Sequence, residues 1–161
     1  MKKLFAMALA AVMMLSLAAC GAKKEEVKDV DLSAFYETIA AEYGMDDNYM
    51  MNLTDDAELM EMYYPGIGAI TTKQLNAKAP MMSAVVNEFV FLQCETEEAA
   101  EEAAAILQSR IDMQADGGAW YPESMEAWGR GVVDRQGTYV AMIASADFKD
   151  GILASWQALF Q

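Results

Sequence analysis

Histidine is absent from this sequence of 161 residues, and cysteine occurs only twice, at positions 20 and 94. Without an imidazole the chain has no Ser-His-Asp or Cys-His catalytic arrangement and no histidine metal site. The sequence also lacks a Ser-x-x-Lys motif, which excludes the lysine-assisted serine enzymes. These absences favour a protein that is not an enzyme, and we expect no cofactor.

Basic residues are also scarce, with 11 Lys and Arg against 25 Asp and Glu. From residue 31 onward six basic residues face 22 acidic ones, which gives that part of the chain a net charge of −16. Such a surface repels phosphate backbones and anionic headgroups, so we expect no nucleic-acid partner and no direct docking on a membrane. The charge favours solubility over a dedicated cationic partner.

The apolar run at the N-terminus has the form of an export signal. Lys2 and Lys3 precede apolar residues from Leu4 onward, and the run ends in Leu17-Ala18-Ala19-Cys20, which resembles a lipobox. Two alternatives are a transmembrane helix, for which 16 residues are short of the roughly 20 required, and ordinary cleavage near Ala18. We predict a signal peptide over residues 1–19 and a lipid on Cys20 that holds the protein on the outer face of the cell membrane.

After Cys20 the sequence predicts a polar tether over residues 20–30 and one acidic domain over residues 31–161. Apolar periodicity and turn residues predict helices over 32–43, 54–64, 96–115 and 147–160, and strands over 85–94, 132–133 and 138–144. This order indicates an α+β fold, with an antiparallel sheet of three or four strands covered by helices.

One segment suggests a binding surface. Trp120 and Tyr121 lie between glycines and a proline, with Trp128 and Arg130 a few residues further on. Exposed aromatic residues in such a loop often anchor a partner, and Arg130 adds a scarce cation. The alternative is a loop that folds its aromatic side chains back over the sheet.

Other candidate sites are weaker. Cys94 lies between Gln93 and Glu95, which would not activate a thiol, so we expect a buried strand cysteine. Asp46-Asp47-Asn48 and Asp55-Asp56 could bind a hard cation, but carboxylates at helix starts explain them better, and we expect no metal site. The ten methionines after the signal could bind copper(I), but packing in the core or a soft contact surface is the stronger interpretation.

Several short stretches together resemble a family of small bacterial lipoproteins known only as a domain of unknown function. They are Ala79-Pro80-Met81-Met82, Asn87-Glu88, Arg110-Ile111-Asp112-Met113-Gln114, Tyr121-Pro122, Gly137-Thr138-Tyr139-Val140 and Ser145-Ala146-Asp147, and the resemblance covers residues 54–160. It implies a lipoprotein of the cell envelope, mostly found in anaerobic Gram-positive bacteria, and transfers no catalytic residue.

Glu88 is unusual on its own chemistry, because a carboxylate inside an apolar strand needs a partner. Arg110 is one candidate, so Glu88 and Arg110 form a candidate buried ion pair.

Two functions remain open from the sequence. The first is a non-enzymatic domain, anchored to the membrane through the lipid on Cys20, that binds a protein, a peptide or a small ligand. The alternative is a carboxylate-dependent hydrolase acting on cell-envelope polymers, for which the sequence gives no pair of carboxylates priority.

Overall fold

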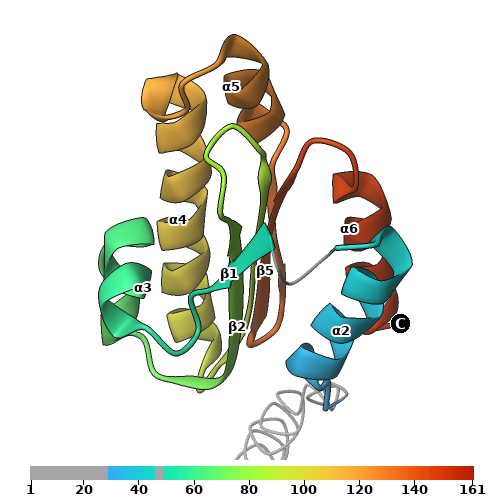
Figure 1. Ribbon diagram of the computed structural model, residues 1–161. Helices are drawn as coiled ribbons and strands as arrows, with labels where there is room; N and C mark the ends of the chain where they lie inside the picture. The colour runs from blue at the N-terminus through green and yellow to red at the C-terminus, as the bar shows by residue number, and fades with distance from the viewer. Residues whose placement is uncertain (1–28, 46–48) are drawn as a thin grey trace, which may run out of the picture.

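The structure is a computed structural model that describes residues 29–45 and 49–161 (Figure 1). The predicted signal peptide, Cys20, most of the tether and Asp46-Asp47-Asn48 lie outside the described residues. In chain order the elements are α2 (Leu32–Tyr43), β1 (Met50–Asn52), α3 (Ala57–Tyr63), η2 (Ile67–Ala69), β2 (Thr72–Pro80), β3 (Asn87–Cys94), α4 (Glu97–Met113), η3 (Gln114–Gly118), α5 (Pro122–Gly129), β4 (Val132–Gln136), β5 (Tyr139–Ser145) and α6 (Lys149–Ala158).

Within the described residues, five strands form one antiparallel sheet in the order β1-β2-β3-β5-β4. Strand β3 is central, and six of its eight residues are buried, as expected from its apolar residues on both faces. Strands β4 and β5 form a hairpin, and Gly137 in its turn has a φ of 60°.

Helices cover both faces of the sheet, which gives three layers (Figure 1). One layer holds α3, α4 and α5, and the other holds α2 and α6. Successive side chains of a strand point to opposite faces. Val90 and Leu92 therefore pack under the first layer, whereas Phe89 and Phe91 pack under the second with Trp156.

The α+β class and the antiparallel sheet are confirmed, but the sheet has five strands and not the predicted three or four. The two strands that were not predicted are β1, which is only three residues long, and β2. Strand β2 reads Thr-Lys-Gln-Leu-Asn-Ala-Lys-Ala-Pro, a composition poor in the β-branched and aromatic residues that mark strands.

Helix starts also differ in detail from the prediction. The second predicted helix begins later than Thr54, because Asp56 is the N-cap and accepts hydrogen bonds from the backbone N–H groups of Glu58 and Leu59. The final helix begins at Lys149 and not at the predicted residue 147. Its N-cap is Phe148, whose N–H donates to Oγ of Ser145.

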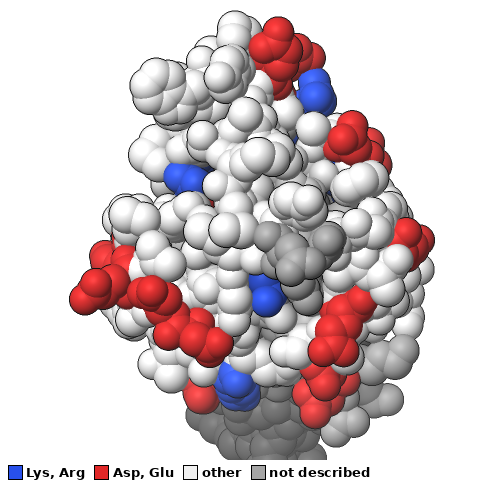
Figure 2. All heavy atoms as spheres, viewed as in Figure 1, with Lys and Arg blue, Asp and Glu red and all other residues white. Residues whose placement is uncertain are grey.

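On the face seen in Figure 2, acidic side chains lie over α3, over α2 and at the end of the molecule that holds α5, and the surface between them carries a few Lys and Arg side chains but is otherwise uncharged. No helix among residues 29–45 and 49–161 has both the length and the apolar character that a membrane crossing requires.

Candidate functional site

The first candidate site is a buried polar cluster under the α3–α4–α5 layer. Glu88 on β3 has only 2% of its surface exposed, although Val90 and Leu92 on the same face of the strand are apolar. Arg110 on α4 donates from Nε to Oε1 of Glu88 at 3.0 Å and from Nη2 to Oε2 at 2.9 Å. Tyr64 donates its hydroxyl to the same Oε1 at 2.8 Å. Three hydrogen bonds thus hold the carboxylate in an apolar layer, where an unpaired charge would be costly.

Two aromatic rings enclose the guanidinium. The ring of Tyr63, at the end of α3, lies 4.8 Å from the central carbon of Arg110, and the ring of Trp128, on α5, lies 5.2 Å from it. Both distances are in the range of cation–π attraction. Burial alone would lower the pKa of Arg110, but the hydrogen bonds and the charge of Glu88 outweigh burial and raise it. Arg110 therefore stays charged and joins all three helices of its layer to the sheet.

The hydrogen bonds of this cluster stabilise the charges of Glu88 and Arg110 and do not favour proton transfer to a substrate. Burial, followed by the charge and hydrogen bond of Glu88, raises the pKa of Tyr64 well above its ordinary value. Glu88 is the one buried carboxylate among the described residues, and its oxygens are already occupied by Arg110 and Tyr64. A general acid or base must be free to reach a substrate, so this carboxylate does not suit the role.

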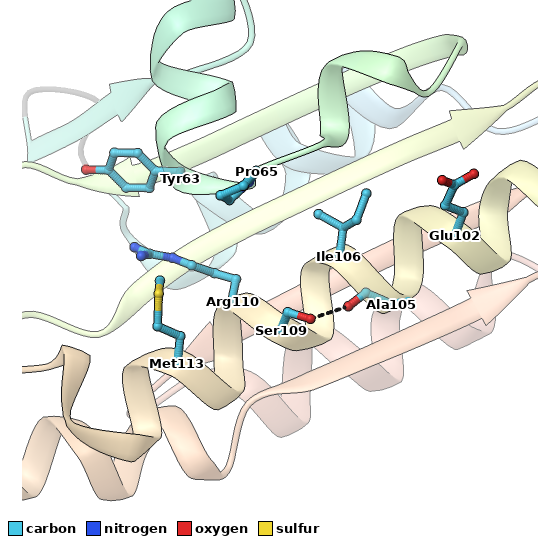
Figure 3. A pocket seen from close by; sticks show the side chains of 8 residues that line it. All are labelled: Tyr63, Pro65, Glu102, Ala105, Ile106, Ser109, Arg110 and Met113. Atoms are coloured by element: carbon cyan, nitrogen blue, oxygen red, sulfur yellow. Dashed lines mark hydrogen bonds between the residues drawn. The ribbon is translucent and has the colours of Figure 1, made fainter.

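A groove of about 340 Å³ lies on the outer side of this cluster, between α4 and the end of α3 (Figure 3). Arg110, Tyr63 and Met113 lie at one end of the groove, and Glu102 lies at the other (Figure 3). The remaining lining residues are small or apolar, apart from one serine: Pro65, Ala105, Ile106 and Ser109. The hydroxyl of Ser109 donates to the carbonyl oxygen of Ala105 at 3.0 Å, which leaves the wall of the groove mainly apolar.

The second candidate site is the aromatic turn, which we define as Trp120 and Tyr121. Trp120 has 84% of its surface exposed and Tyr121 has 55%. The backbone on either side is fixed: Ala119 is buried and its N–H donates to Gln114, while the carbonyl oxygen of Tyr121 accepts from Met125 in the first turn of α5. Two large aromatic side chains are thus held out into solvent on an ordered turn, as in an anchor for a partner.

The other two residues predicted for this surface do not belong to it. Residues 122–129 form helix α5 and not the predicted loop. Trp128 is 4% exposed and packs on Arg110, because the helix turns that ring into the layer. Arg130 is the C-cap at the opposite end of α5 from Tyr121, and its guanidinium pairs with Glu126 at 2.7 Å. Only Trp120 and Tyr121 remain as an exposed aromatic pair.

Cys94 is buried at the end of β3, and burial raises the pKa of its thiol. That shift makes the thiolate scarcer, which is unfavourable for a nucleophile. Asp55 and Asp56, the acidic pair considered as a cation site, form hydrogen bonds with nearby residues of the chain. Asp56 caps α3, and Asp55 accepts a hydrogen bond from the side chain of Asn52. Within the described ranges there is no group of three or more acidic or cysteine side chains placed to hold a metal ion.

Sequence reasoning placed Glu88 and Arg110 together but missed Tyr63 and Tyr64. A signal was available, because a buried carboxylate can accept about four hydrogen bonds and one arginine does not supply them all. Adjacent tyrosines directly before Pro65 offered a further donor and a ring, but their distance from Glu88 in the sequence concealed the connection.

A domain of unknown function, DUF4358, matches residues 43–145, more than half of the chain. The chain belongs to the DUF4358 family. The DUF4358 match contains the sheet, α3, α4 and α5, and therefore the buried cluster, the groove and the aromatic turn. It begins at the last residue of α2 and ends before α6, so the second helical layer lies almost wholly outside it. No curated protein and no solved structure matches this DUF4358 protein.

Proposed function

We propose that this protein is a non-enzymatic binding domain, anchored by a lipid on Cys20 to the outer face of the cell membrane of a Gram-positive bacterium. Its partner is a protein, a peptide or a small ligand. The observation that carries the binding role is the aromatic turn, in which Trp120 is 84% exposed on an ordered backbone. Burying a ring of this size normally stabilises a folded domain, so its exposure favours a surface that a partner covers.

The anchor rests on a different observation, the Leu17-Ala18-Ala19-Cys20 segment after an apolar run. The acidic surface supports it indirectly, because a net negative domain gains nothing from anionic headgroups and depends on the lipid for its attachment. The alternative of a carboxylate-dependent hydrolase has no favourable observation in the described part of the chain and stays a prediction.

The anchor is tested by feeding cells a labelled fatty acid and fractionating them. Cys20→Ser should abolish the label and release the protein from the membrane or leave it unprocessed. Cys94→Ala, the matched change at the other cysteine, should leave both label and location as in the unmodified protein. Membrane retention of Cys20→Ser with an unchanged label would contradict the anchor.

The binding role is tested by placing a photoreactive amino acid at position 120 in intact cells. We expect a crosslink to a defined partner that is lost when Tyr121 in the same chain is changed to Ala. Position 62 is the matched control, because Met62 on α3 is also exposed, at 64%. Identical crosslinks from positions 62 and 120, or none from either, would contradict the aromatic turn as a binding surface.

A further inference from the structure

We propose that the groove between α3 and α4 binds a free oligopeptide of three or four residues with apolar side chains. The peptide carboxylate lies at Arg110 and its ammonium group at Glu102. This inference rests on the proposed role as a binding domain and adds a site and a ligand class. None of the residues that line the groove belongs to the aromatic turn, so the two surfaces can be tested separately.

At the cationic end of the groove, Arg110 has N–H groups that donate no hydrogen bond to a described residue. A guanidinium carries five N–H groups. Glu88 takes one from Nε and one from Nη2, and no other hydrogen bond from Arg110 to a described residue is present. Arg110 keeps 13% of its side-chain surface exposed and lines the groove beside Tyr63 (Figure 3). A ligand carboxylate placed there receives charge-assisted hydrogen bonds from a side chain that Glu88 already holds in position.

The opposite end carries the complementary charge. Glu102 is exposed, and it forms no ion pair with any residue that the structure describes. Among the residues that line the groove, Arg110 and Glu102 are the only charged ones. A cation at one end and an anion at the other match a zwitterion with its charges at its two ends.

The separation of these two residues sets the length of the ligand. Glu102 and Arg110 are eight residues apart on α4. At about 1.5 Å per residue the helix separates their Cα positions by about 12 Å, and this separation sets the scale of the ligand. An extended peptide advances about 3.3–3.6 Å per residue, so three or four residues span the distance. The groove volume of about 340 Å³ lies at the lower end of the range for ligand sites, as a ligand this small requires.

The wall between the two charges determines which side chains the peptide carries. Pro65, Ala105 and Ile106 line this part, and they favour apolar side chains in a ligand (Figure 3). A fatty acid would satisfy Arg110 and the apolar wall but would leave Glu102 without a partner. The role of Glu102 therefore distinguishes a peptide from an acyl chain.

The test uses the full-length protein in lipid nanodiscs and isothermal titration with the peptide Ala-Leu-Ala. The free C-terminus of the peptide should contribute most to its affinity. The amidated peptide should bind about 10–100-fold more weakly, because it loses charge-assisted hydrogen bonds to Arg110. The N-acetylated peptide should bind about 2–5-fold more weakly, since the pair with exposed Glu102 is weaker. Leucine alone should bind more weakly than Ala-Leu-Ala because it cannot reach both ends.

Variants of exposed residues avoid disturbing the buried cluster. Glu102→Gln should weaken binding of the free peptide to the level of the acetylated peptide, and should leave the acetylated peptide unaffected. Glu101→Gln, a matched change at the next exposed residue outside the groove lining, should have no effect. Ala105→Trp should fill the groove and abolish binding, whereas Ala154→Trp on the exposed side of α6 should not.

Equal binding of the free, amidated and acetylated peptides, or no binding at millimolar concentration, would overturn the inference. So would full binding to Ala105→Trp, or tight binding of a fatty acid that Glu102→Gln does not alter. If these titrations fail while crosslinking from position 120 succeeds, the peptide site is wrong and the proposed function stands. If the titrations succeed and no crosslink forms, the aromatic turn is wrong instead.

Discussion

Arg110 and Glu88 meet through two parallel hydrogen bonds, Nε to Oε1 at 3.0 Å and Nη2 to Oε2 at 2.9 Å, between helix α4 and the central strand β3. The pair is almost completely enclosed, with 13% and 2% of the two side chains exposed. A buried ion pair of this kind is costly to break and contributes less to stability than its geometry suggests. The pair joins α4 to the central strand and holds the guanidinium at the end of the groove.

Removing one partner of the ion pair should lower the free energy of unfolding far more than replacing the whole cluster with apolar side chains. Arg110→Met leaves a buried carboxylate without its cation, and we expect a loss of about 3–5 kcal/mol in the free energy of unfolding. The triple variant Glu88→Met, Arg110→Met and Tyr64→Phe removes both charges and the hydroxyl of the cluster. Its free energy of unfolding should be close to that of the unmodified protein. Urea unfolding followed by circular dichroism measures both. A triple variant as unstable as Arg110→Met would contradict this account.

Alkaline pH should destabilise the protein through Tyr64. The folded state raises the pKa of Tyr64 through burial and through the charge of Glu88, whereas the unfolded chain releases that proton near pH 10. Above about pH 10 the unfolded state therefore binds fewer protons than the folded state, and the free energy of unfolding falls as pH rises.

The variant Tyr64→Phe isolates this effect. It should cost about 1–3 kcal/mol at neutral pH, because Glu88 loses a hydrogen bond, and its stability should fall less steeply above pH 10. Urea unfolding at a series of pH values gives both profiles, and the other tyrosines contribute equally to each. Parallel profiles would show that Tyr64 ionises normally in the folded state.

Replacing Trp128 should lower the free energy of unfolding strongly, whereas replacing Trp120 should leave it almost unchanged. Trp128→Ala removes a buried ring that packs on Arg110 and should cost about 3–5 kcal/mol. Trp120→Ala removes an exposed ring and should change the free energy of unfolding by less than about 0.5 kcal/mol. Thermal and urea unfolding measure both. A large loss in Trp120→Ala would mean that this ring serves packing and not binding.

The turn that presents Trp120 depends on Gly118. A Cβ at Gly118 would lie 2.7 Å from the carbonyl oxygen of Met113, which is backbone and cannot move aside. Gly118→Ala should therefore cost about 1–3 kcal/mol and displace the aromatic turn.

Gly129 provides the control for this change. It is the last residue of α5, and its Cβ would lie 3.9 Å from Cβ of Ala115, an ordinary contact. Gly129→Ala should be neutral or stabilise the protein by up to about 1 kcal/mol, since alanine has less freedom in the unfolded chain. Equal losses in the two variants would contradict the strain assigned to Gly118.

Elements whose signals are local were predictable from the sequence. Helix α2 was expected over residues 32–43, and it has those bounds because Asp31 caps its first N–H groups and Gly44, with a φ of 64°, ends it. Thr96 likewise caps α4, and β3 follows from its own run of apolar residues. In each case the residues that decide the element lie within it or at its ends.

Strand β2 was missed because its stability comes from residues elsewhere in the chain. Gln74 within it donates to the carbonyl oxygen of Val30 at 2.8 Å and to the side chain of Gln93 at 2.9 Å, and accepts from the N–H of Leu32 at 3.0 Å. A glutamine that is a weak strand former alone thus joins the start of α2 to the sheet. Such contacts depend on neighbours that the local sequence does not contain.

By itself, the sequence determined the charge, the absence of imidazole chemistry, the bounds of helix α2, the central strand and the need of Glu88 for a partner, because each follows from residue type or local spacing. Only the tertiary structure decided that Trp128 is buried while Trp120 is exposed, that Tyr64 completes the cluster, and that Arg110 and Glu102 lie at the two ends of one groove. The physical reason is that burial and convergence depend on how α3, α4 and α5 pack on the sheet, and residues far apart in the chain fix that packing.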